Sequence, residues 1–357
     1  MSIQLFETSA GAKIYQIPLE AFPGLSGYAY LALVDGYRVL VDSGSGVGNS
    51  NSDLEAGLKE AGALAAQNGL WQGDEFTFAD LTHILITHAH IDHFGGLATI
   101  CERSSAKIGV HELDLRNLTN YEERLVVVSH RLEEYLLEAG ISEKGRKDLL
   151  EMYLITKSLF HSVRVDFTYE SVGMHLGPFE MLHVPGHCPG EVVIRLHDIL
   201  FSGDHVLQET SPHQSPEQIT LSTGLDHYLK SLEALRRWAP DVRLALGGHK
   251  EPITDLSGRI GEIRSLHMQR LQKVLDILSE AHTIADVSRF LFGDARGYNA
   301  LLAVEEAGAH VEYLYQRGLL EIDNLQELSS SPVPVPIRYR CIECSVERMS
   351  RINPIID

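Results

Sequence analysis

Hydrophobic and polar positions follow two different periods along this chain. Short apolar runs at residues 84–86, 108–110, 199–203 and 244–246 are bounded by polar or Gly-rich turns, which predicts buried β-strands. Between such runs, residues 51–66 and 225–238 repeat their apolar positions every three or four residues, as a helix does. Strands and helices therefore alternate over residues 1–110 and again over about 163–255. This alternation predicts an α/β domain.

A segment at about 112–162 separates these two halves and has a helical pattern throughout. Its apolar positions recur at spacings of three and four, Gly140 interrupts them, and a second helical run follows; the positions are Leu125, Val128, Leu132, Tyr135 and Leu136, then Leu149, Leu150, Tyr153 and Leu154. Long insertions in compact domains usually serve a function. Two arrangements stay open: a lid over the residues that follow strand 84–86, or a helical pair packed at the edge of the domain.

The chain after residue 258 predicts a small, mostly helical part. Residues 263–278 form an amphipathic helix, Thr283 offers an N-cap for a second helix, a third runs over 299–316, and 318–322 returns as a strand. We therefore divide the chain into 1–258 (with the insertion), 259–325 and an extended tail at 326–357. Cys341 and Cys344 form a lone CxxC in that tail, which is half of a zinc ribbon. Ordinary free thiols are expected, unless a second chain supplies the other ligands.

The composition of the chain indicates which kinds of binding partner and which cellular compartment suit it. The 357 residues carry a formal net charge of −19 and only four cysteines. An acidic chain is a poor match for nucleic acid or an anionic membrane, and few cysteines suit a reducing compartment. No basic-then-apolar leader and no bilayer-length apolar run stands out. We expect a cytoplasmic protein that acts on a small molecule, with a homodimer as an alternative to a monomer.

The run His88-Ala89-His90-Ile91-Asp92-His93 directly follows the predicted strand 84–86. It places three imidazoles and a carboxylate in six residues, and these are the groups that zinc binds most readily, and iron and manganese to a lesser extent. Buried polar groups are costly unless something satisfies them, so packing alone does not explain such a cluster. The run predicts a metal site at a strand end.

Three further candidate ligands share one local layout. His187, Asp204 and His249 each stand in a Gly-rich turn after an apolar run, where glycine lets the backbone turn sharply. Each of these residues by itself is weak evidence, since a lone loop histidine is more often structural or solvated. Together with the run at 88–93, the three indicate one shared site.

In these positions the chain resembles the metallo-β-lactamase superfamily of hydrolases, over roughly residues 10–255. The resemblance implies an αββα sandwich and two metal ions. It assigns the first ion to His88, His90 and His187, and the second to Asp92, His93 and His249, with Asp204 bridging the two. Asp42, in the run from Arg38 to Gly46, would orient a ligand histidine or its loop. The C-terminal helices resemble a winged-helix appendage that some members carry.

Two divalent ions, zinc first and iron or manganese as alternatives, can lower the pKa of a shared water enough to supply hydroxide near neutral pH. Asp92 and Asp204 are the carboxylates expected to take part, Asp92 mainly as a ligand. Thiolate is a good leaving group that needs no dedicated general acid. The leading hypothesis is a glyoxalase II-like thioesterase for acyl-CoA or acyl-glutathione substrates.

Two other functions stay open. The first is a metal-dependent ribonuclease or phosphodiesterase, against which the acidic charge argues. The second is a regulatory or partner-binding protein without catalysis. The third C-terminal helix carries Glu305, Glu306 and Glu312 with only Arg317 at its end, so we expect a structural or dimerising appendage rather than a nucleic-acid surface.

Overall fold

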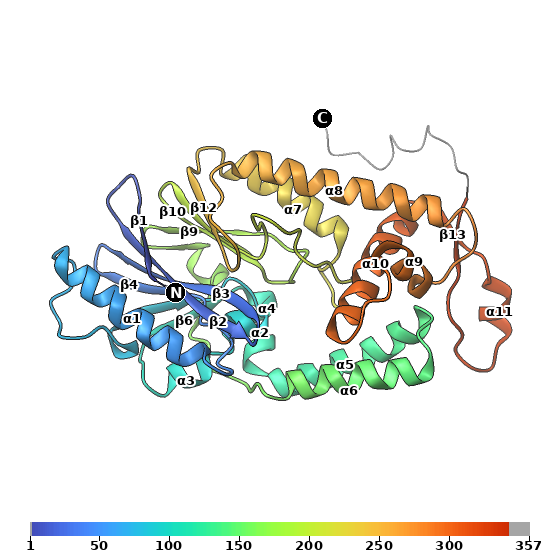
Figure 1. Cartoon of the computed structure of the whole chain (residues 1–357), viewed down its shortest axis with the longest axis horizontal. Coiled ribbons are helices and arrows are strands. Elements are labelled where there is room, and N and C mark those ends of the chain that lie inside the picture. Colours follow the sequence, from blue (N-terminus) through green and yellow to red (C-terminus); the bar gives the residue numbers. More distant parts are fainter. Residues whose placement is uncertain (1, 343–357) are drawn as a thin grey trace. The chain divides into compact units, whose positions relative to one another are not determined.

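A computed structural model describes residues 2–342 of the chain (Figure 1). These residues form two compact units. The first unit comprises the chain up to Glu122 together with Phe160–Pro212 and Leu232–Ile260. The second comprises Glu123–Leu159, His213–Ser231 and the described chain from Gly261 onward. No helix among the described residues is both long and apolar enough to cross a membrane.

A seven-stranded sheet forms one layer of the first unit. Its strands stand in chain order: β1 (Gln4–Glu7), β2 (Lys13–Phe22), β3 (Leu25–Val34), β4 (Tyr37–Val41), β5 (His83–Leu85), β6 (Lys107–Val110) and β7 (Phe167–Thr168). Strands β1 to β4 form an antiparallel meander, and β4 to β7 are parallel. Because β7 comes from the second βα-rich half of the chain, the first sheet combines strands of both halves.

The second layer is a five-stranded sheet of order β12-β11-β10-β9-β8. Its strands are β8 (His175–Leu176), β9 (Phe179–His183), β10 (Val192–Leu196), β11 (Ile199–Gly203) and β12 (Leu244–Gly247). β11 and β12 are parallel, so both run toward the same edge of the sheet. The apolar runs at 199–203 and 244–246 are thus buried strands, as predicted, and the structure shows that they are neighbours.

The core of the first unit lies between the two sheets. Buried side chains of both layers form one cluster there, including Tyr30, Val39 and Leu85 of the first sheet and Val192 and Phe201 of the second. Helix α1 (Ser50–Gln67) packs closely on the first sheet, because a Cβ at Gly57 would lie only 2.2 Å from Ile17 Cγ2. This confirms the predicted sandwich of sheets with outer helices.

Short elements complete the first unit. They are the 3₁₀ turns η1 (Phe78–Asp80) and η2 (Glu170–Val172) and the helices α2 (Ile91–Phe94), α3 (Leu97–Cys101) and α4 (Glu112–Thr119). Helix α2 begins inside the histidine-rich run, and α4 directly follows β6. Both helices therefore start at the carboxyl ends of adjacent parallel strands.

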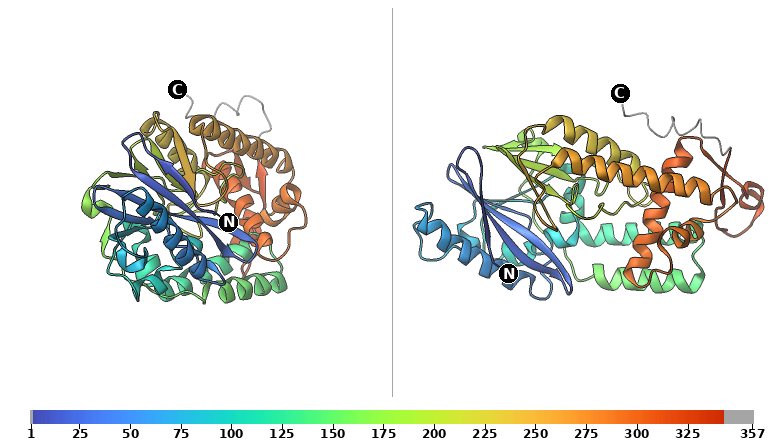
Figure 2. Two further views of the ribbon diagram at one scale, coloured as in Figure 1. Left: turned by 60° about the vertical axis from the view of Figure 1, so that its left-hand side comes forward. Right: turned by 45° about the horizontal axis from the view of Figure 1, so that its top comes forward.

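The second unit is mostly helical (Figure 2). Its elements are α5 (Tyr121–Glu138), α6 (Glu143–Lys157), α7 (Leu225–Trp238), α8 (Leu256–Ile277), α9 (Ile284–Phe292), α10 (Tyr298–Gln316), β13 (Leu320–Ile322), α11 (Leu325–Ser330) and β14 (Tyr339–Cys341). Three of these, α5, α7 and α8, also have residues in the first unit. The helix predicted at 225–238 has the observed bounds of α7.

The inserted helices α5 and α6 pack on the C-terminal part of the chain. The Tyr135 hydroxyl donates to the Val304 carbonyl at 2.8 Å, and the Ala285 N–H donates to the Ala139 carbonyl at 2.8 Å. Gly140, the predicted helix break, lies against Thr283. The sequence did not predict this neighbour for the insertion. Segments separated by more than 140 residues therefore share one core.

The C-terminal elements follow the predicted order of three helices and a strand. Thr283 caps α9 through a capping box with Asp286. β13 pairs with β14 in an antiparallel hairpin, and α11 lies between them in the chain. In the tail from residue 326, residues 326–330 belong to helix α11 and not to an extended stretch, and Tyr339–Cys341 form the strand β14. Cys341 is part of β14, whereas Cys344 lies outside the described residues.

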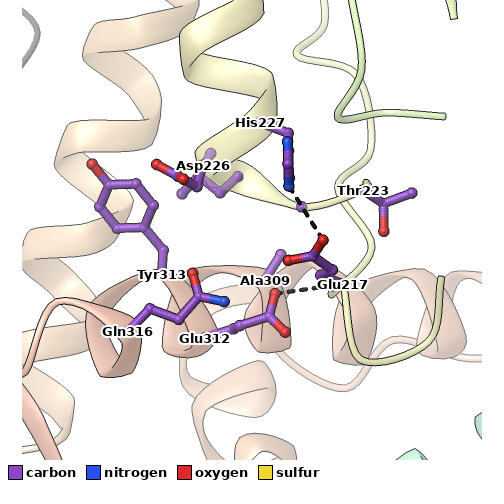
Figure 3. A pocket seen from close by; sticks show the side chains of 10 residues that line it. Glu217, Thr223, Asp226, His227, Ala309, Glu312, Tyr313 and Gln316 are labelled. Atoms are coloured by element: carbon purple, nitrogen blue, oxygen red, sulfur yellow. Dashed lines mark hydrogen bonds and ion pairs between the residues drawn. The ribbon is translucent and has the colours of Figure 1, made fainter. Parts of the chain in front are cut away.

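Backbone N–H groups of the segment 213–231 donate to the side chain of Glu312 in α10 (Figure 3). The Glu312 carboxylate accepts the N–H groups of Glu217 at 2.9 Å and Gln218 at 3.2 Å, and the Glu217 carboxylate lies 3.3 Å from His227 Nε2. Burial raises the pKa of Glu312, and these donors offset part of that effect. The carboxylates of Glu217 and Glu312 therefore fix the conformation of the segment 213–231 beside α10.

Candidate metal centre

The candidate ligands come from loops at the ends of strands of both sheets, all in the first unit. The run 88–93 follows β5, His187 follows β9, Asp204 follows β11, and His249 follows β12. Parallel strands deliver the residues after them to the same edge of a sheet. The local pattern that suggested a shared site from the sequence is thus matched by a common location in the fold.

His88, His90 and His187 lie together. His88 Nε2 and His90 Nδ1 are 3.0 Å apart, and the ring centres of His90 and His187 are 4.5 Å apart. Each of the three offers a ring nitrogen within 4.8 Å of the others. Three imidazole nitrogens at such distances match a zinc position that keeps room for a fourth ligand.

Asp92, His93 and His249 form a second such group. His249 Nε2 lies 3.3 Å from Asp92 Oδ2, and the ring centres of His93 and His249 are 5.7 Å apart. Asp204 stands between the two groups, because its carboxylate oxygens are 4.0 Å from His187 Nε2 and 3.6 Å from both His93 Nε2 and His249 Nε2. All residues predicted as ligands are therefore brought together.

The donors fit divalent ions. His93 Nε2 and Asp204 Oδ1 are buried and have no hydrogen-bond partner among the described residues, although they face each other at 3.6 Å. Such orphaned buried atoms are costly unless something satisfies them. Imidazole nitrogen and carboxylate oxygen are the donor types that zinc, iron and manganese accept. A pair of divalent ions would satisfy both atoms.

The pKa values of the site histidines shift in opposite directions. Burial and the neighbouring imidazoles hold the pKa of His88 well below its usual value, which favours the neutral ligand form. Burial also opposes charge on His249, but Asp204 and Asp92 outweigh it and raise the pKa of His249 to about 9. Ion binding at this second group must therefore displace a proton, and its affinity rises with pH.

Other groups orient the ligand histidines. Asp42 accepts from His93 Nδ1 at 2.8 Å and from the N–H and hydroxyl of Thr87, both at 2.8 Å. His249 Nδ1 donates to the Ser26 carbonyl at 2.7 Å. These bonds leave the Nε2 atoms of His93 and His249 to face the site, which is the usual arrangement around a metal. Asp42 has a φ of 59°, a strained conformation for a non-glycine residue.

Gly248 approaches the site too closely for any side chain. A Cβ there would lie 2.4 Å from His93 Cε1 and 2.7 Å from Asp204 Oδ1. The glycine before His249 therefore allows the two ligands to converge.

Sequence patterns missed two buried carboxylates beside the ligands. Glu191 Oε1 accepts the Asp204 N–H at 3.1 Å, and burial together with the Asp204 charge raises the pKa of Glu191 well above its usual value. Asp114 accepts the N–H of Ala89 at 2.9 Å. Only one signal in the sequence could have pointed to Asp114: it follows a predicted strand that runs beside strand 84–86.

Another histidine and glutamate cluster lies in the second unit. His267, Glu306 and His310 are buried with their donor atoms within 4.8 Å of one another. The Glu306 carboxylate already accepts from Arg270 at 2.8 Å and from the Gln214 N–H at 2.8 Å, and His267 Nδ1 faces His310 Nε2 at 3.2 Å. The Glu306 carboxylate is thus satisfied by protein groups and supports packing of the helices, whereas His267 Nε2 is buried with no hydrogen-bond partner among the described residues.

The chain belongs to the metallo-β-lactamase superfamily, a superfamily of metal-dependent hydrolases, whose family model matches residues 22–249. A probable metallo-hydrolase, YqgX of Bacillus subtilis, is 27% identical over 180 residues, which cover 48% of this chain and 70% of that protein. The metallo-beta-lactamase fold-containing protein ST1585 of Sulfurisphaera tokodaii is 29% identical over 136 residues, covering 36% of this chain and 47% of that protein.

Solved structures extend the similarity over almost the whole chain. The metallo-beta-lactamase family protein TTHA1429 from Thermus thermophilus superposes with a TM-score of 0.70 at 26% identity, covering 92% of this chain and 98% of that one. A beta-lactamase domain protein from Burkholderia ambifaria gives a TM-score of 0.66 at 21% identity, covering 95% and 94%. The fold with its additional helical region is therefore shared with known structures.

Proposed function

We propose that this protein is a dinuclear metal-dependent hydrolase that cleaves a thioester of the acyl-CoA or acyl-glutathione type. The observation that supports it is the convergence of two donor groups with Asp204 between them. His88, His90 and His187 would hold one ion, and Asp92, His93 and His249 the other. Two such ions, zinc in the first instance, supply a water of lowered pKa and stabilise negative charge that develops on the substrate.

Neighbouring protein groups orient the ligand side chains, and the burial of these side chains sets which side of the centre is open. Asp42 and the Ser26 carbonyl fix the rings of His93 and His249, so that their Nε2 atoms stay directed into the site. Asp92 and His249 keep 16% and 11% of their side chains exposed, which leaves this side of the centre open to a substrate. His88 and His93 are more deeply buried, which limits competing water.

The leaving group is the argument for a thioester. Glu191 is a carboxyl beside the site whose raised pKa favours the protonated form, but its side chain is fully buried and bonded to the Asp204 backbone. It is therefore placed to support Asp204 and not to protonate a substrate. A thiolate leaves readily without a proton donor because a thiol has a pKa of about 8.5.

The net charge of −19 supports a small-molecule substrate over RNA, since nucleic-acid affinity depends largely on positive charge. Cytoplasmic location is part of the same proposal.

The experiment measures thiol release from a panel of acyl-CoA and acyl-glutathione thioesters by the zinc-, manganese- or iron-loaded protein. Single-stranded RNA and a phosphodiester reporter are assayed in parallel. We expect thiol release that His249→Ala abolishes and that His161→Ala, a change at a largely exposed histidine, leaves intact. Cleavage of RNA or the phosphodiester with no thioester hydrolysis would overturn the proposal in favour of a nuclease.

A further inference from the structure

Asp114 is a fully buried carboxylate at the start of α4, the helix that follows β6. Burying a carboxylate is costly unless hydrogen bonds satisfy its oxygens. Its Oδ2 accepts the Ala89 N–H at 2.9 Å, and its Oδ1 accepts the Gly190 N–H at 3.1 Å and the Asn117 amide at 3.1 Å. The Cys188 thiol donates to Oδ2 at 3.4 Å.

The two backbone donors come from different ligand loops. Ala89 stands between His88 and His90, and Gly190 is three residues after His187. One carboxylate therefore joins the two chain segments that carry the three imidazoles of the first group. The contact is also tight, because a Cβ at Gly190 would lie 2.5 Å from Asp114 Cγ.

The second group is held by different residues. His93 is oriented by Asp42, His249 by the Ser26 carbonyl, and Asp204 by Glu191. Asp42 reaches both groups, because the Thr87 hydroxyl that donates to it also lies 3.1 Å from His88 Nδ1. Asp114, in contrast, bonds among the described residues only to the 88–90 and 187–190 segments of the first group and to its own helix.

We propose that Asp114 is a positioning residue for the ion held by His88, His90 and His187, acting through the backbone of Ala89 and Gly190 without touching the ion. The proposal rests on the dinuclear centre proposed above. Asp114→Asn replaces one acceptor oxygen with an amide that cannot accept, so one of the two loops loses its anchor. Loss of such a supporting partner weakens metal binding by about 10- to 100-fold.

The test measures zinc affinity by chelator competition in two backgrounds, with zinc content measured on the same samples. His249→Ala leaves only the first donor group complete, and His187→Ala leaves only the second. We expect Asp114→Asn to weaken zinc binding by about 10- to 100-fold in the His249→Ala background and by less than about threefold in the His187→Ala background.

Asp166→Asn is the matched control. Asp166 also accepts a backbone N–H of the first sheet, that of Ile108 at 2.9 Å, but touches no ligand loop. It should leave both affinities unchanged. If circular dichroism shows that Asp114→Asn does not fold, Asn117→Ala serves in its place, because it removes the amide that donates to Asp114. This variant should lower zinc affinity less strongly, and only in the His249→Ala background.

Equal weakening in both backgrounds, or in neither, would overturn the role of Asp114. Failure of the parent protein to bind two zinc ions would instead overturn the dinuclear centre itself. The two failures are therefore distinguishable from the zinc content of the parent and the variants.

Discussion

Replacing Gly248 with alanine should weaken the second ion position while leaving the fold intact. The new Cβ would lie 2.4 Å from His93 Cε1 and 2.7 Å from Asp204 Oδ1, whereas ordinary contacts begin at 3.4 Å. The two ligands would have to retreat by 3.4 − 2.4 = 1.0 Å and 3.4 − 2.7 = 0.7 Å. Gly248 does not have a positive φ, so the backbone itself accepts alanine.

The surroundings resist this retreat. Asp42 holds the His93 ring through Nδ1, and Glu191 holds the backbone of Asp204. Overpacking of this kind costs about 1–3 kcal/mol. If the cost falls on the ion-binding geometry, zinc affinity at this position drops by roughly 5- to 150-fold.

Zinc affinity by chelator competition and metal-free thermal unfolding, measured on the same protein, separate the two effects. Gly261→Ala is the matched control, since a Cβ at Gly261 meets nothing within 4 Å. The reasoning would be refuted by a Gly248→Ala protein that binds two zinc ions as tightly as the parent. An equal loss in Gly261→Ala would also contradict it.

Three further predictions concern stability. Removing bound ions with a chelator should lower the unfolding temperature, because ions at 100 times their Kd add about 2.7 kcal/mol to the free energy of unfolding. A melting temperature that the chelator does not change would contradict this prediction. Burial and His310 lower the pKa of His267 to about 3. In the unfolded chain the His267 imidazole is protonated near pH 6.5, whereas in the folded protein it stays neutral. The free energy of unfolding should therefore fall by about 1 kcal/mol from pH 6.5 to 5.5 because of this residue. Urea unfolding of His267→Gln should not show this part of the acid sensitivity. Thr283→Ala removes the cap of α9 and should cost about 1 kcal/mol in the same assay, whereas Ser279→Ala, outside the capping box, should cost less.

The sequence by itself determined the local elements and the chemical identity of the site. Helix Leu225–Trp238, the cap at Thr283 and strand β11 follow from residues that are close together in the chain. Their periodicity and capping chemistry act within a few residues, so a sequence displays them directly. The donor types at 88–93 are equally local, because metal preference depends on side-chain chemistry.

Only the tertiary structure decided how distant segments meet. The short strand β7 joins the first sheet although it follows the inserted helices in the chain, and those helices pack against α9 and α10. Asp114 has a role only because α4 brings its carboxylate between two ligand loops that are about 100 residues apart in the chain. Such contacts depend on burial and hydrogen bonds between remote residues, and no local period records them.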